Sequence, residues 1–355
     1  MVIESFIQET KNIVSGYLQS YLKQTVLPQV SPVGKWGNDA VQRILNVTSQ
    51  GKLLRSSLLF LATESFSNQY DHEVAVKTAA AIELVQTGLL VHDDIMDQDE
   101  KRRGFDSMHI QYKKILEQSG TKNPDRIGES LALCVGDMTF FLAFHIFSTI
   151  EPPHLSVKLT NLFSSEIAKV GVAQMQDVYG GNTQKELTKD EILSIYTYKT
   201  GRYTCGLPLV AGAIIGGAHP QTIRHLWKLG TALGILYQIK DDWLNIFGNP
   251  QKTGKPAGSD IREGKQTLYR LFLLEKSDSK TKEKLRSLYG NPKITEKDTA
   301  FVQKEIKTLG VEEEINMIVE KQKEIVNEVL SHLPIPEDKR VLFDEFIRYI
   351  TEREK

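Results

Sequence analysis

The sequence predicts an all-α fold, a single-domain bundle of about a dozen helices. Apolar residues recur at intervals of three and four through most of the chain, as they do on one face of a helix. No long stretch alternates apolar and polar residues, so no sheet is indicated. No linker rich in Pro, Ser or Gly separates two regions of different composition. We therefore expect one domain over residues 1–355.

The predicted helices follow one another between clear breakers. The strongest helical patterns are VQRILNV (41–47), IELVQTGLLVHDDIMD (82–97), LTNLFSSEIAKVGVAQMQDVYG (159–180), EILSIYTYKTGRYT (191–204) and HLWKLGTALGILYQIKDDWLNIF (225–247). Thr188 and Asp190 before Glu191 indicate a helix start, and Lys199-Thr200-Gly201 is expected to end a helical pattern. The polar, Gly-rich segment 248–264 predicts a long loop, and loops of that length in compact domains are usually functional or disordered.

One helix is long and apolar enough to imitate a membrane span. It covers residues 131–150, LALCVGDMTFFLAFHIFSTI. Asp137 and His145 within it would be costly in lipid. A helix that is apolar all round is otherwise a buried central helix of a large protein. We expect that arrangement, with no transmembrane segment.

Charge, cysteine content and the first residues argue against a nucleic-acid-binding protein, a disulfide-rich protein and a signal peptide. The formal net charge is −1, which gives no electrostatic footprint for a nucleic acid. The two cysteines, Cys134 and Cys205, form neither a disulfide framework nor a metal-ligand pattern. The first residues include Glu4 and Glu9 and lack the basic start of a signal peptide. A cytoplasmic protein is therefore expected.

Two aspartate-rich motifs carry most of the chemical information. Asp93-Asp94-Ile95-Met96-Asp97 and Asp241-Asp242-Trp243-Leu244-Asn245 each follow a long apolar helical pattern. Residues four apart on a helix lie on the same face, so each motif stacks its first and last oxygen-bearing side chains. Acidic groups at a C-terminal helix end oppose the helix dipole and need a compensating partner. Such oxygen clusters suit Mg²⁺, which shares its coordination with phosphate oxygens and water.

Cationic residues accompany both motifs. Lys52 and Arg55 precede an apolar helix, where a helix N-terminus favours anions. Arg102 and Arg103 follow the first motif by little more than one turn. Others lie near the second motif or in other helices and loops: Lys199, Lys240, Lys255 and Lys265. Together these charges predict a site that grips a diphosphate through bridging metal ions.

These residues resemble the motifs of the trans-isoprenyl diphosphate synthases, also called polyprenyl synthetases, which include the farnesyl and geranylgeranyl diphosphate synthases. The resemblance runs in order from Gly51 to Lys265. The matching residues are Gly51-Lys52 and Arg55 (GKxxR), Gln86 (His or Gln), Asp93, Asp94 and Asp97 (first motif), Arg102-Arg103-Gly104 (RRG), Gly136-Asp137 (GD), Gln174 and Asp177 (GQxxD), Lys199-Thr200 (KT), Gln238, Asp241, Asp242 and Asn245 (second motif), Gly258-Ser259-Asp260-Ile261 and Gly264-Lys265 (downstream loop).

The chain departs from the family pattern at several positions. Leu53 and Ser56 replace the Arg and Pro of GKRxRP, and Ala173 replaces a glycine. Asn245 stands where the family's second motif ends in Asp. It keeps an oxygen ligand but loses a charge, so a weakened peripheral metal contact is expected.

The resemblance implies a helical bundle around a deep central cavity, usually as a homodimer. The reaction would join isopentenyl diphosphate to an allylic diphosphate by ionisation, condensation and elimination, with three Mg²⁺ ions per site. The implied metal residues are Asp93, Asp94, Asp97, Asp241, Asp242 and Asn245, with Asp94 and Asp242 acting from behind the principal ligands. Arg102, Lys199 and Lys255 would hold the allylic diphosphate, whereas Lys52, Arg55, Gln86 and Arg103 would hold isopentenyl diphosphate. Thr200 and Gln238 would face the carbocation.

The resemblance also bears on product length. Family members that stop early carry bulky aromatic residues at the positions of Gly88 and Leu89. Neither residue here blocks a tunnel, so geranylgeranyl diphosphate or a longer product is expected. Phe140, Phe141 and Phe144 are alternative floor residues, although ordinary core packing explains them equally well.

Three alternatives stay open from the sequence. A class I terpene cyclase shares the fold and the first motif but binds only one diphosphate. A non-catalytic subunit of a heteromeric synthase often loses its Asp motifs, which this chain keeps. A structural helical protein with incidental acidic clusters leaves the ordered cations unexplained.

Overall fold

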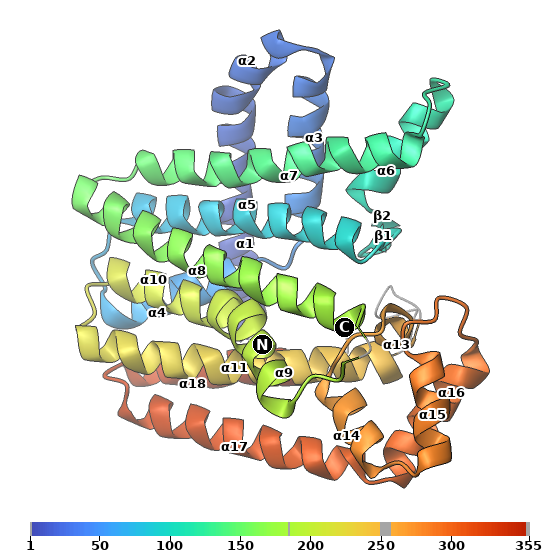
Figure 1. Ribbon diagram of the computed structural model, residues 1–355. Helices are drawn as coiled ribbons and strands as arrows, with labels where there is room; N and C mark the ends of the chain where they lie inside the picture. Colours follow the sequence, from blue (N-terminus) through green and yellow to red (C-terminus); the bar gives the residue numbers. More distant parts are fainter. Residues whose placement is uncertain (1, 184, 249–256, 353–355) are drawn as a thin grey trace. The chain divides into compact units, whose positions relative to one another are not determined.

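The protein is almost entirely helical, which confirms the predicted all-α class (Figure 1). The computed structural model describes residues 2–183, 185–248 and 257–352. Within those ranges the only strands are β1 (Lys101–Arg102) and β2 (Phe105–Asp106), which pair antiparallel. This small hairpin was not predicted from the sequence. The chain divides into two compact units by its internal contacts, and the single domain over residues 1–355 stays a prediction.

The first unit comprises residues 1–164, 208–219 and 335–343. Its helices are α1 (Val2–Ser20), the π-helical segment η1 (Tyr21–Val26), α2 (Leu27–Val30), the 3-10 turn η2 (Ser31–Val33), α3 (Lys35–Ser49), α4 (Leu54–Phe66), α5 (His72–Met96), α6 (Met108–Gln118) and α7 (Pro124–Ser148), with parts of α8 (Pro153–Gly181), α10 (Leu207–Ile215) and α18 (Glu337–Thr351).

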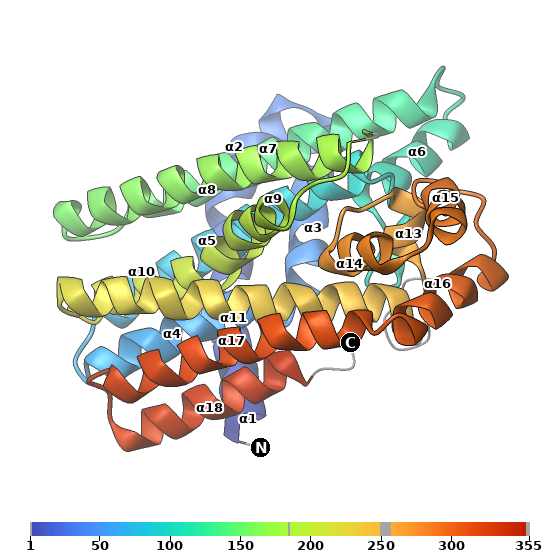
Figure 2. The ribbon, with the colours of Figure 1, turned by 60° about the horizontal axis from the view of Figure 1, so that its bottom comes forward.

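The second unit comprises residues 165–207, 220–334 and 344–355. Its helices are α9 (Lys189–Ile195), the π-helical segment η3 (Tyr196–Gly206), α11 (Pro220–Phe247), α13 (Ser259–Glu263), α14 (Leu268–Lys276), α15 (Ser279–Leu288), α16 (Glu296–Thr308) and α17 (Val311–His332), with the remainders of α8 and α18. Helix α17 runs along α11 in both views (Figures 1 and 2).

Helix α5 is the apolar centre of the first unit. Asp71 caps its N-terminus, because its side chain accepts hydrogen bonds from the N–H groups of Glu73 and Val74. The middle of the helix, residues 79–82, is completely buried. In its most apolar stretch of 18 residues, 78% of the residues are buried within the chain. The motif that ends this helix is therefore fixed to a rigid core element.

Helices α5 and α7 approach closely through two glycines. A Cβ on Gly88 would lie 2.4 Å from Thr139 Oγ1 and 2.9 Å from the carbonyl O of Gly136, and a Cβ on Gly136 would lie 2.4 Å from His92 Nε2. Gly88 therefore faces α7. The control of product length at this position stays a prediction, and a side chain there would also carry a packing cost because it meets α7.

Helix α7 corrects the expectation that it is buried. Like α5, it has the length and hydropathy of a membrane span. In its most apolar stretch of 18 residues, however, only 39% of the residues are buried. Phe141 is 75% exposed. The segment is therefore not the buried central helix that its composition predicted, and some of its apolar side chains are exposed.

In the second unit, η3 packs against α11 through small residues. A Cβ on Gly234 would lie 2.2 Å from Gly201 Cα, and a Cβ on Gly230 would lie 2.3 Å from Gly206 Cα. We expected the helical pattern to end at Lys199-Thr200-Gly201. Instead, the helix that begins with α9 continues in π geometry, as η3, through Gly206. Thr188 caps the preceding helix α9 in a capping box with Glu191, so the predicted start is confirmed.

Candidate functional site

The first acidic cluster consists of Asp93, Asp94, Asp97 and Asp99, where α5 ends. Asp93 and Asp94 lie in its last turn, and the N–H of Asp97 donates to the carbonyl O of Asp93 over 2.9 Å. Asp94 is only 4% exposed, whereas Asp93 and Asp97 are half-buried. The helix end is thus the acidic terminus that the sequence predicted.

Arg102 supplies positive charge to this cluster. Its Nε donates to Asp94 Oδ1 over 2.6 Å, and its Nη2 lies 3.5 Å from Asp93 Oδ2 and 3.4 Å from Asp99 Oδ2. Burial raises the pKa of Asp94 and the charge of Arg102 opposes that effect, leaving the pKa at about 6. Burial acts to lower the pKa of Arg102, but Asp94 and Asp93 hold it above its ordinary value.

The hairpin β1–β2 places the two neighbouring arginines. Its two central residues, Arg103 and Gly104, both have positive φ angles, 53° and 83°. Two-residue hairpin loops of type I′ require that geometry. A Cβ on Gly51 would lie 3.3 Å from Arg103 Nη1, so the absence of a side chain at Gly51 lets this guanidinium approach the loop before α4. Arg103 and the GKxxR element are therefore neighbours, as the resemblance implied.

The remaining predicted anion-binding residues of the first unit lie just before α4, on α4 and on α5. Lys52 is exposed, and Arg55 is half-buried in the first turn of α4. Leu53 precedes that helix in a left-handed conformation, with φ of 52°. Gln86 is half-buried on α5. A helix N-terminus with adjacent cations favours anions, which supports the predicted role of Lys52 and Arg55.

The second acidic cluster is built around the last turns of α11 and consists of Asp177, Asp241, Asp242, Asn245 and Asp260. Asp241 is half-buried, whereas Asp242 is 2% exposed. The two adjacent aspartate pairs, Asp93-Asp94 and Asp241-Asp242, thus each combine one partly exposed carboxylate with one buried carboxylate. This difference in exposure agrees with the predicted roles, in which the partly exposed aspartates bind metal directly and the buried ones orient them.

Asp242 is held by a hydrogen-bond chain that the sequence did not predict. The hydroxyl of Tyr196 donates to Asp242 Oδ2, and Gln238 Nε2 donates to Asp242 Oδ1 over 2.8 Å. Thr200 Oγ1 in turn donates to Gln238 Oε1 over 2.7 Å. Burial raises the pKa of Asp242 to about 7, although both donors oppose the shift. The chain fixes the orientations of Thr200 and Gln238.

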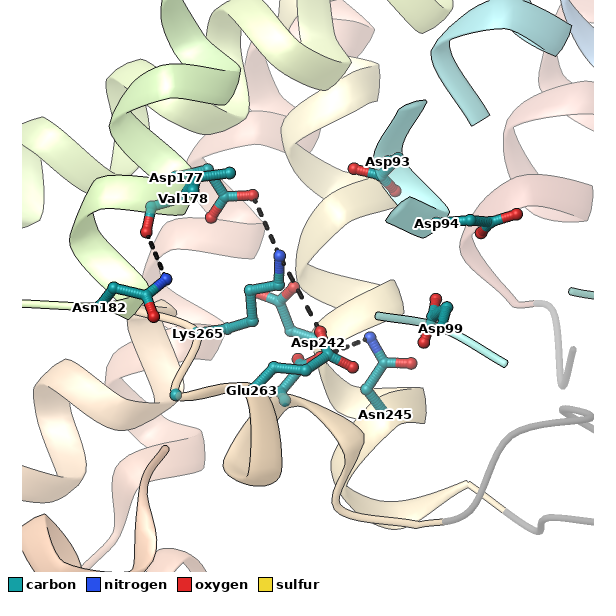
Figure 3. Close-up of polar contacts among 12 residues, drawn as sticks. Asp93, Asp94, Asp99, Asp177, Val178, Asn182, Asp242, Asn245, Glu263 and Lys265 are labelled. Atoms are coloured by element: carbon teal, nitrogen blue, oxygen red, sulfur yellow. Dashed lines mark hydrogen bonds and ion pairs between the residues drawn. The ribbon is translucent and has the colours of Figure 1, made fainter. Parts of the chain in front are cut away.

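Two lysines, Lys199 and Lys265, approach Asp177, and Figure 3 shows the approach of Lys265. Lys199 Nζ donates to Asp177 Oδ2 over 2.7 Å, and Lys265 Nζ lies 3.6 Å from the same oxygen. The structure therefore brings the KT, GQxxD and downstream-loop motifs together within the second unit. Lys255 lies outside the described residues.

Asn245 contacts α13 (Figure 3). Its Nδ2 donates to Asp260 Oδ1 over 2.9 Å, and its carbonyl O accepts from the N–H of Gly258 over 2.7 Å. Burial, followed by the nearby carboxylates of Asp242, Glu263 and Asp241, holds the pKa of Asp260 well above its usual range. The amide of Asn245 thus donates where a carboxylate would add another negative charge.

Replacing Asn245 with Asp tests this contact. We expect the variant to lose about 1–3 kcal/mol of unfolding free energy in EDTA, because the donor to buried Asp260 is gone. Added Mg²⁺ should restore part of the loss. The measurement is urea unfolding with EDTA or Mg²⁺.

The control for this substitution is Asn12→Asp on α1. Asn12 is exposed, and its side-chain oxygen accepts from Gln8 Nε2. An aspartate can accept the same bond, so little change is expected. Equal stability of Asn245→Asp and the unmodified protein in EDTA would show that the Asn245–Asp260 contact is unimportant.

The residues present fit Mg²⁺. Within the described residues, no three acidic, histidine or cysteine side chains form a complete metal-binding group. Mg²⁺ is commonly bound through one or two carboxylates together with water and substrate phosphates. Half-buried Asp93, Asp97 and Asp241 provide that donor type.

The sequence reasoning did not single out several residues that the structure connects to these clusters. They are Glu83, Tyr196 and, as a partner of Asn245, Asp260. Glu83 carried a signal, since it is a charged residue in the apolar stretch AAAIELV. Tyr196 carried none, because its partner is distant in sequence.

The chain matches the family model described as polyprenyl synthetase over residues 35–306. It is 34% identical over 245 residues to a short chain isoprenyl diphosphate synthase of Methanothermobacter thermautotrophicus, covering 69% of this chain and 70% of that protein. It is 29% identical over 339 residues to a geranylgeranyl diphosphate synthase of Sulfolobus acidocaldarius, covering 94% of each chain.

A solved structure is also similar over nearly the whole length. It is a geranylgeranyl pyrophosphate synthase of Corynebacterium glutamicum complexed with isoprenyl diphosphate and magnesium. The TM-score is 0.90, the sequence identity is 26%, and 99% of each chain is covered. That protein therefore shares the fold of this chain.

Proposed function

The chain belongs to the polyprenyl synthetase family, which makes it a trans-prenyltransferase, and we propose that it condenses isopentenyl diphosphate with an allylic diphosphate in a Mg²⁺-dependent reaction. The observation that carries the proposal is the composition of the two acidic clusters. Each ends a long helix and combines a half-buried aspartate with a buried one. Cationic side chains accompany each, which suits a diphosphate bound through metal ions.

In the proposed site, Asp93, Asp97 and Asp241 are the principal metal ligands, for three ions. Asp94 and Asp242 support them from buried positions, and Asn245 makes a peripheral contact. When bound, the metal ions would supply positive charge that stabilises the departing pyrophosphate. Arg102, Lys199 and Lys255 are proposed to bind the allylic diphosphate.

A second group of residues is proposed to bind isopentenyl diphosphate without metal. It consists of Lys52, Arg55, Gln86 and Arg103. The contact between Gly51 and Arg103 supports it, because it brings RRG and GKxxR to one place in the first unit. Guanidinium groups suit phosphate oxygens, which they bind in a bidentate manner.

The chemistry follows from these positions. The allylic C–O bond breaks, the electron pair leaves with pyrophosphate, and the double bond of isopentenyl diphosphate attacks the carbocation. A proton then leaves the new intermediate, and pyrophosphate accepts it. Thr200 and Gln238 offer oriented dipoles without a strong nucleophile, and their hydrogen-bond chain to Asp242 supports this role.

We also propose that the protein acts as a homodimer in the cytoplasm. The exposed apolar face of α7 supports the dimer, because Phe141 is 75% exposed on a helix of high mean hydropathy. Large exposed apolar patches mark interaction sites. A second copy of this chain is the proposed partner.

Incubation with labelled isopentenyl diphosphate, allylic primers and Mg²⁺ tests the reaction. Chain-elongated diphosphates are expected, and their length can be read after dephosphorylation. Cyclic hydrocarbon formed without use of isopentenyl diphosphate would support a terpene cyclase instead. Activity only after addition of another subunit would support a heteromeric synthase.

We propose geranylgeranyl diphosphate as the main product, with Leu89 controlling length. Leu89 is half-buried on α5, one turn before Asp93, and the two share a helix face. Leu89→Phe is expected to shorten the dominant product by at least one isoprene unit, because its ring would cross the path of the growing chain. Chromatography of dephosphorylated products measures this.

Ile115→Phe on α6 is the matched control, since Ile115 is an exposed apolar residue and should leave product length unchanged. An unchanged distribution in a folded, active Leu89→Phe variant would favour a floor on α7. Phe140 is the first candidate there, because its ring packs edge-on against the ring of His92, with the two ring centroids 5.4 Å apart.

A further inference from the structure

Glu83 is a buried carboxylate in the middle of an apolar helix. It lies on α5, one turn before Gln86, and is only 7% exposed. Burying a charge is costly unless it is paired and hydrogen-bonded. The partners of Glu83 therefore indicate why it is there.

Ser56 holds the Glu83 carboxylate through two donors. The Ser56 N–H donates to Glu83 Oε1 over 3.2 Å, and Ser56 Oγ donates to the same oxygen over 2.7 Å. Ser56 is completely buried in the first turn of α4, where backbone N–H groups have no carbonyl within the helix. Glu83 thus caps α4 from another helix.

Position 56 is also where this chain departs from the family element GKRxRP. A proline there has no N–H and no hydroxyl, so it can donate neither bond. The serine of this chain converts an apolar position into a two-donor anchor for Glu83. The departure is therefore a gain of interactions and not only a loss of proline.

Two arginines act on the same carboxylate. Burial raises the pKa of Glu83, and the charge of Arg55 is the largest influence opposing it, followed by the two Ser56 bonds and then the charge of Arg103. Arg103 lies beside Gly51, at the start of the same segment. Both predicted guanidinium ligands of isopentenyl diphosphate therefore interact electrostatically with this one buried carboxylate.

The backbone around these arginines is in unfavourable geometry. Arg103 and Leu53, the latter directly before α4, both have positive φ angles. Non-glycine residues keep that conformation only where their surroundings hold it. A fixed carboxylate that attracts Arg55 and Arg103 supplies such a constraint.

We propose that Glu83, anchored by Ser56, is a positioning residue that orients Arg55 and Arg103 toward the diphosphate of isopentenyl diphosphate. This rests on the function proposed above. The carboxylate offsets repulsion between the two guanidinium groups and fixes their direction before substrate arrives, so less ordering remains to be done on binding. The allylic diphosphate is assigned to other residues and is unaffected.

The test compares Glu83→Gln, Ser56→Ala and Ser56→Pro with the unmodified protein. Glu83→Gln keeps the shape but removes the charge, Ser56→Ala removes one donor, and Ser56→Pro removes both. Isopentenyl diphosphate is titrated calorimetrically in EDTA, and KM is measured for each substrate with Mg²⁺. For Glu83→Gln, we expect roughly tenfold weaker binding and a matching rise in that KM alone. Ser56→Pro should follow, and Ser56→Ala should show a smaller effect.

The matched control is Ser57→Ala. Ser57 is also completely buried on α4, but its hydroxyl donates to the carbonyl O of Leu53 within the same segment. It should leave the affinity for isopentenyl diphosphate unchanged. A general packing defect would instead change both KM values or affect Ser57→Ala equally.

Unchanged affinity for isopentenyl diphosphate in folded Glu83→Gln and Ser56→Pro, with the unmodified protein active, would overturn the positioning role and leave the proposed function intact. If Glu83→Gln does not fold, Ser56→Pro decides the question. An unmodified protein that neither binds nor consumes isopentenyl diphosphate would overturn the proposed function, and the positioning role with it.

Discussion

Replacing either Asp93 or Asp241 with alanine is expected to lower turnover by about 10²–10³, because each change removes a carboxylate that helps to stabilise charge in the transition state. Both residues are half-buried members of their aspartate pairs, so neither should be needed for folding. Turnover is measured with saturating allylic and isopentenyl diphosphates over a range of Mg²⁺ concentrations. Folding is checked by circular dichroism and thermal unfolding.

The matched control is Asp338→Ala, which removes an exposed aspartate from the first turn of α18. It should keep full turnover. The unmodified protein should lose activity in EDTA and regain it with Mg²⁺. Near-normal turnover in both Asp93→Ala and Asp241→Ala, or full activity in EDTA, would contradict the metal-dependent mechanism.

Replacing Gly234 with alanine is expected to destabilise the protein by about 1–3 kcal/mol, because overpacking of a tight contact forces the backbone to move. The new Cβ would lie 2.2 Å from Gly201 Cα and 2.7 Å from Gly201 N, which no side-chain rotation can relieve. Separation of η3 from α11 would also disturb the hydrogen bond from Thr200 to Gln238, so turnover should fall. Urea unfolding and steady-state kinetics measure the two effects.

Gly171→Ala on α8 is the control, and we expect it to stabilise the protein where Gly234→Ala destabilises it. Gly171 is exposed, and an added Cβ there would have no neighbour within 4 Å. Alanine in an open helical position stabilises by about 0.5–1 kcal/mol relative to glycine. Equal effects of the two substitutions would show that the glycine contact between η3 and α11 does not limit stability.

The local features of the site could be predicted from the sequence. The stacking of Asp93 with Asp97 and the helix start at Thr188 depend on residues within about one turn. The helix ends and the capping box agree with those predictions. The ordered motifs also predicted the family, to which the chain belongs.

The orientation of helix faces could not be predicted in the same way. Gly88 and Leu89 are neighbours in sequence, yet Gly88 is buried against α7 while Leu89 is half-buried. The apolar composition of α7 predicted burial, but Phe141 is largely exposed. Composition states how much apolar surface a helix has and leaves open what covers it.

The helical class and the family could be read from the amino-acid sequence, because helix periodicity and capping depend on nearby residues and each motif is a short run of residues. The pairing of each buried carboxylate with its donor became visible only in the folded chain. Ser56 reaches Glu83 from another helix, Tyr196 reaches Asp242, and Asn245 reaches Asp260. All three contacts form for the same physical reason. A buried carboxylate requires a hydrogen-bond donor, and in each case folding brings that donor from a residue distant in sequence.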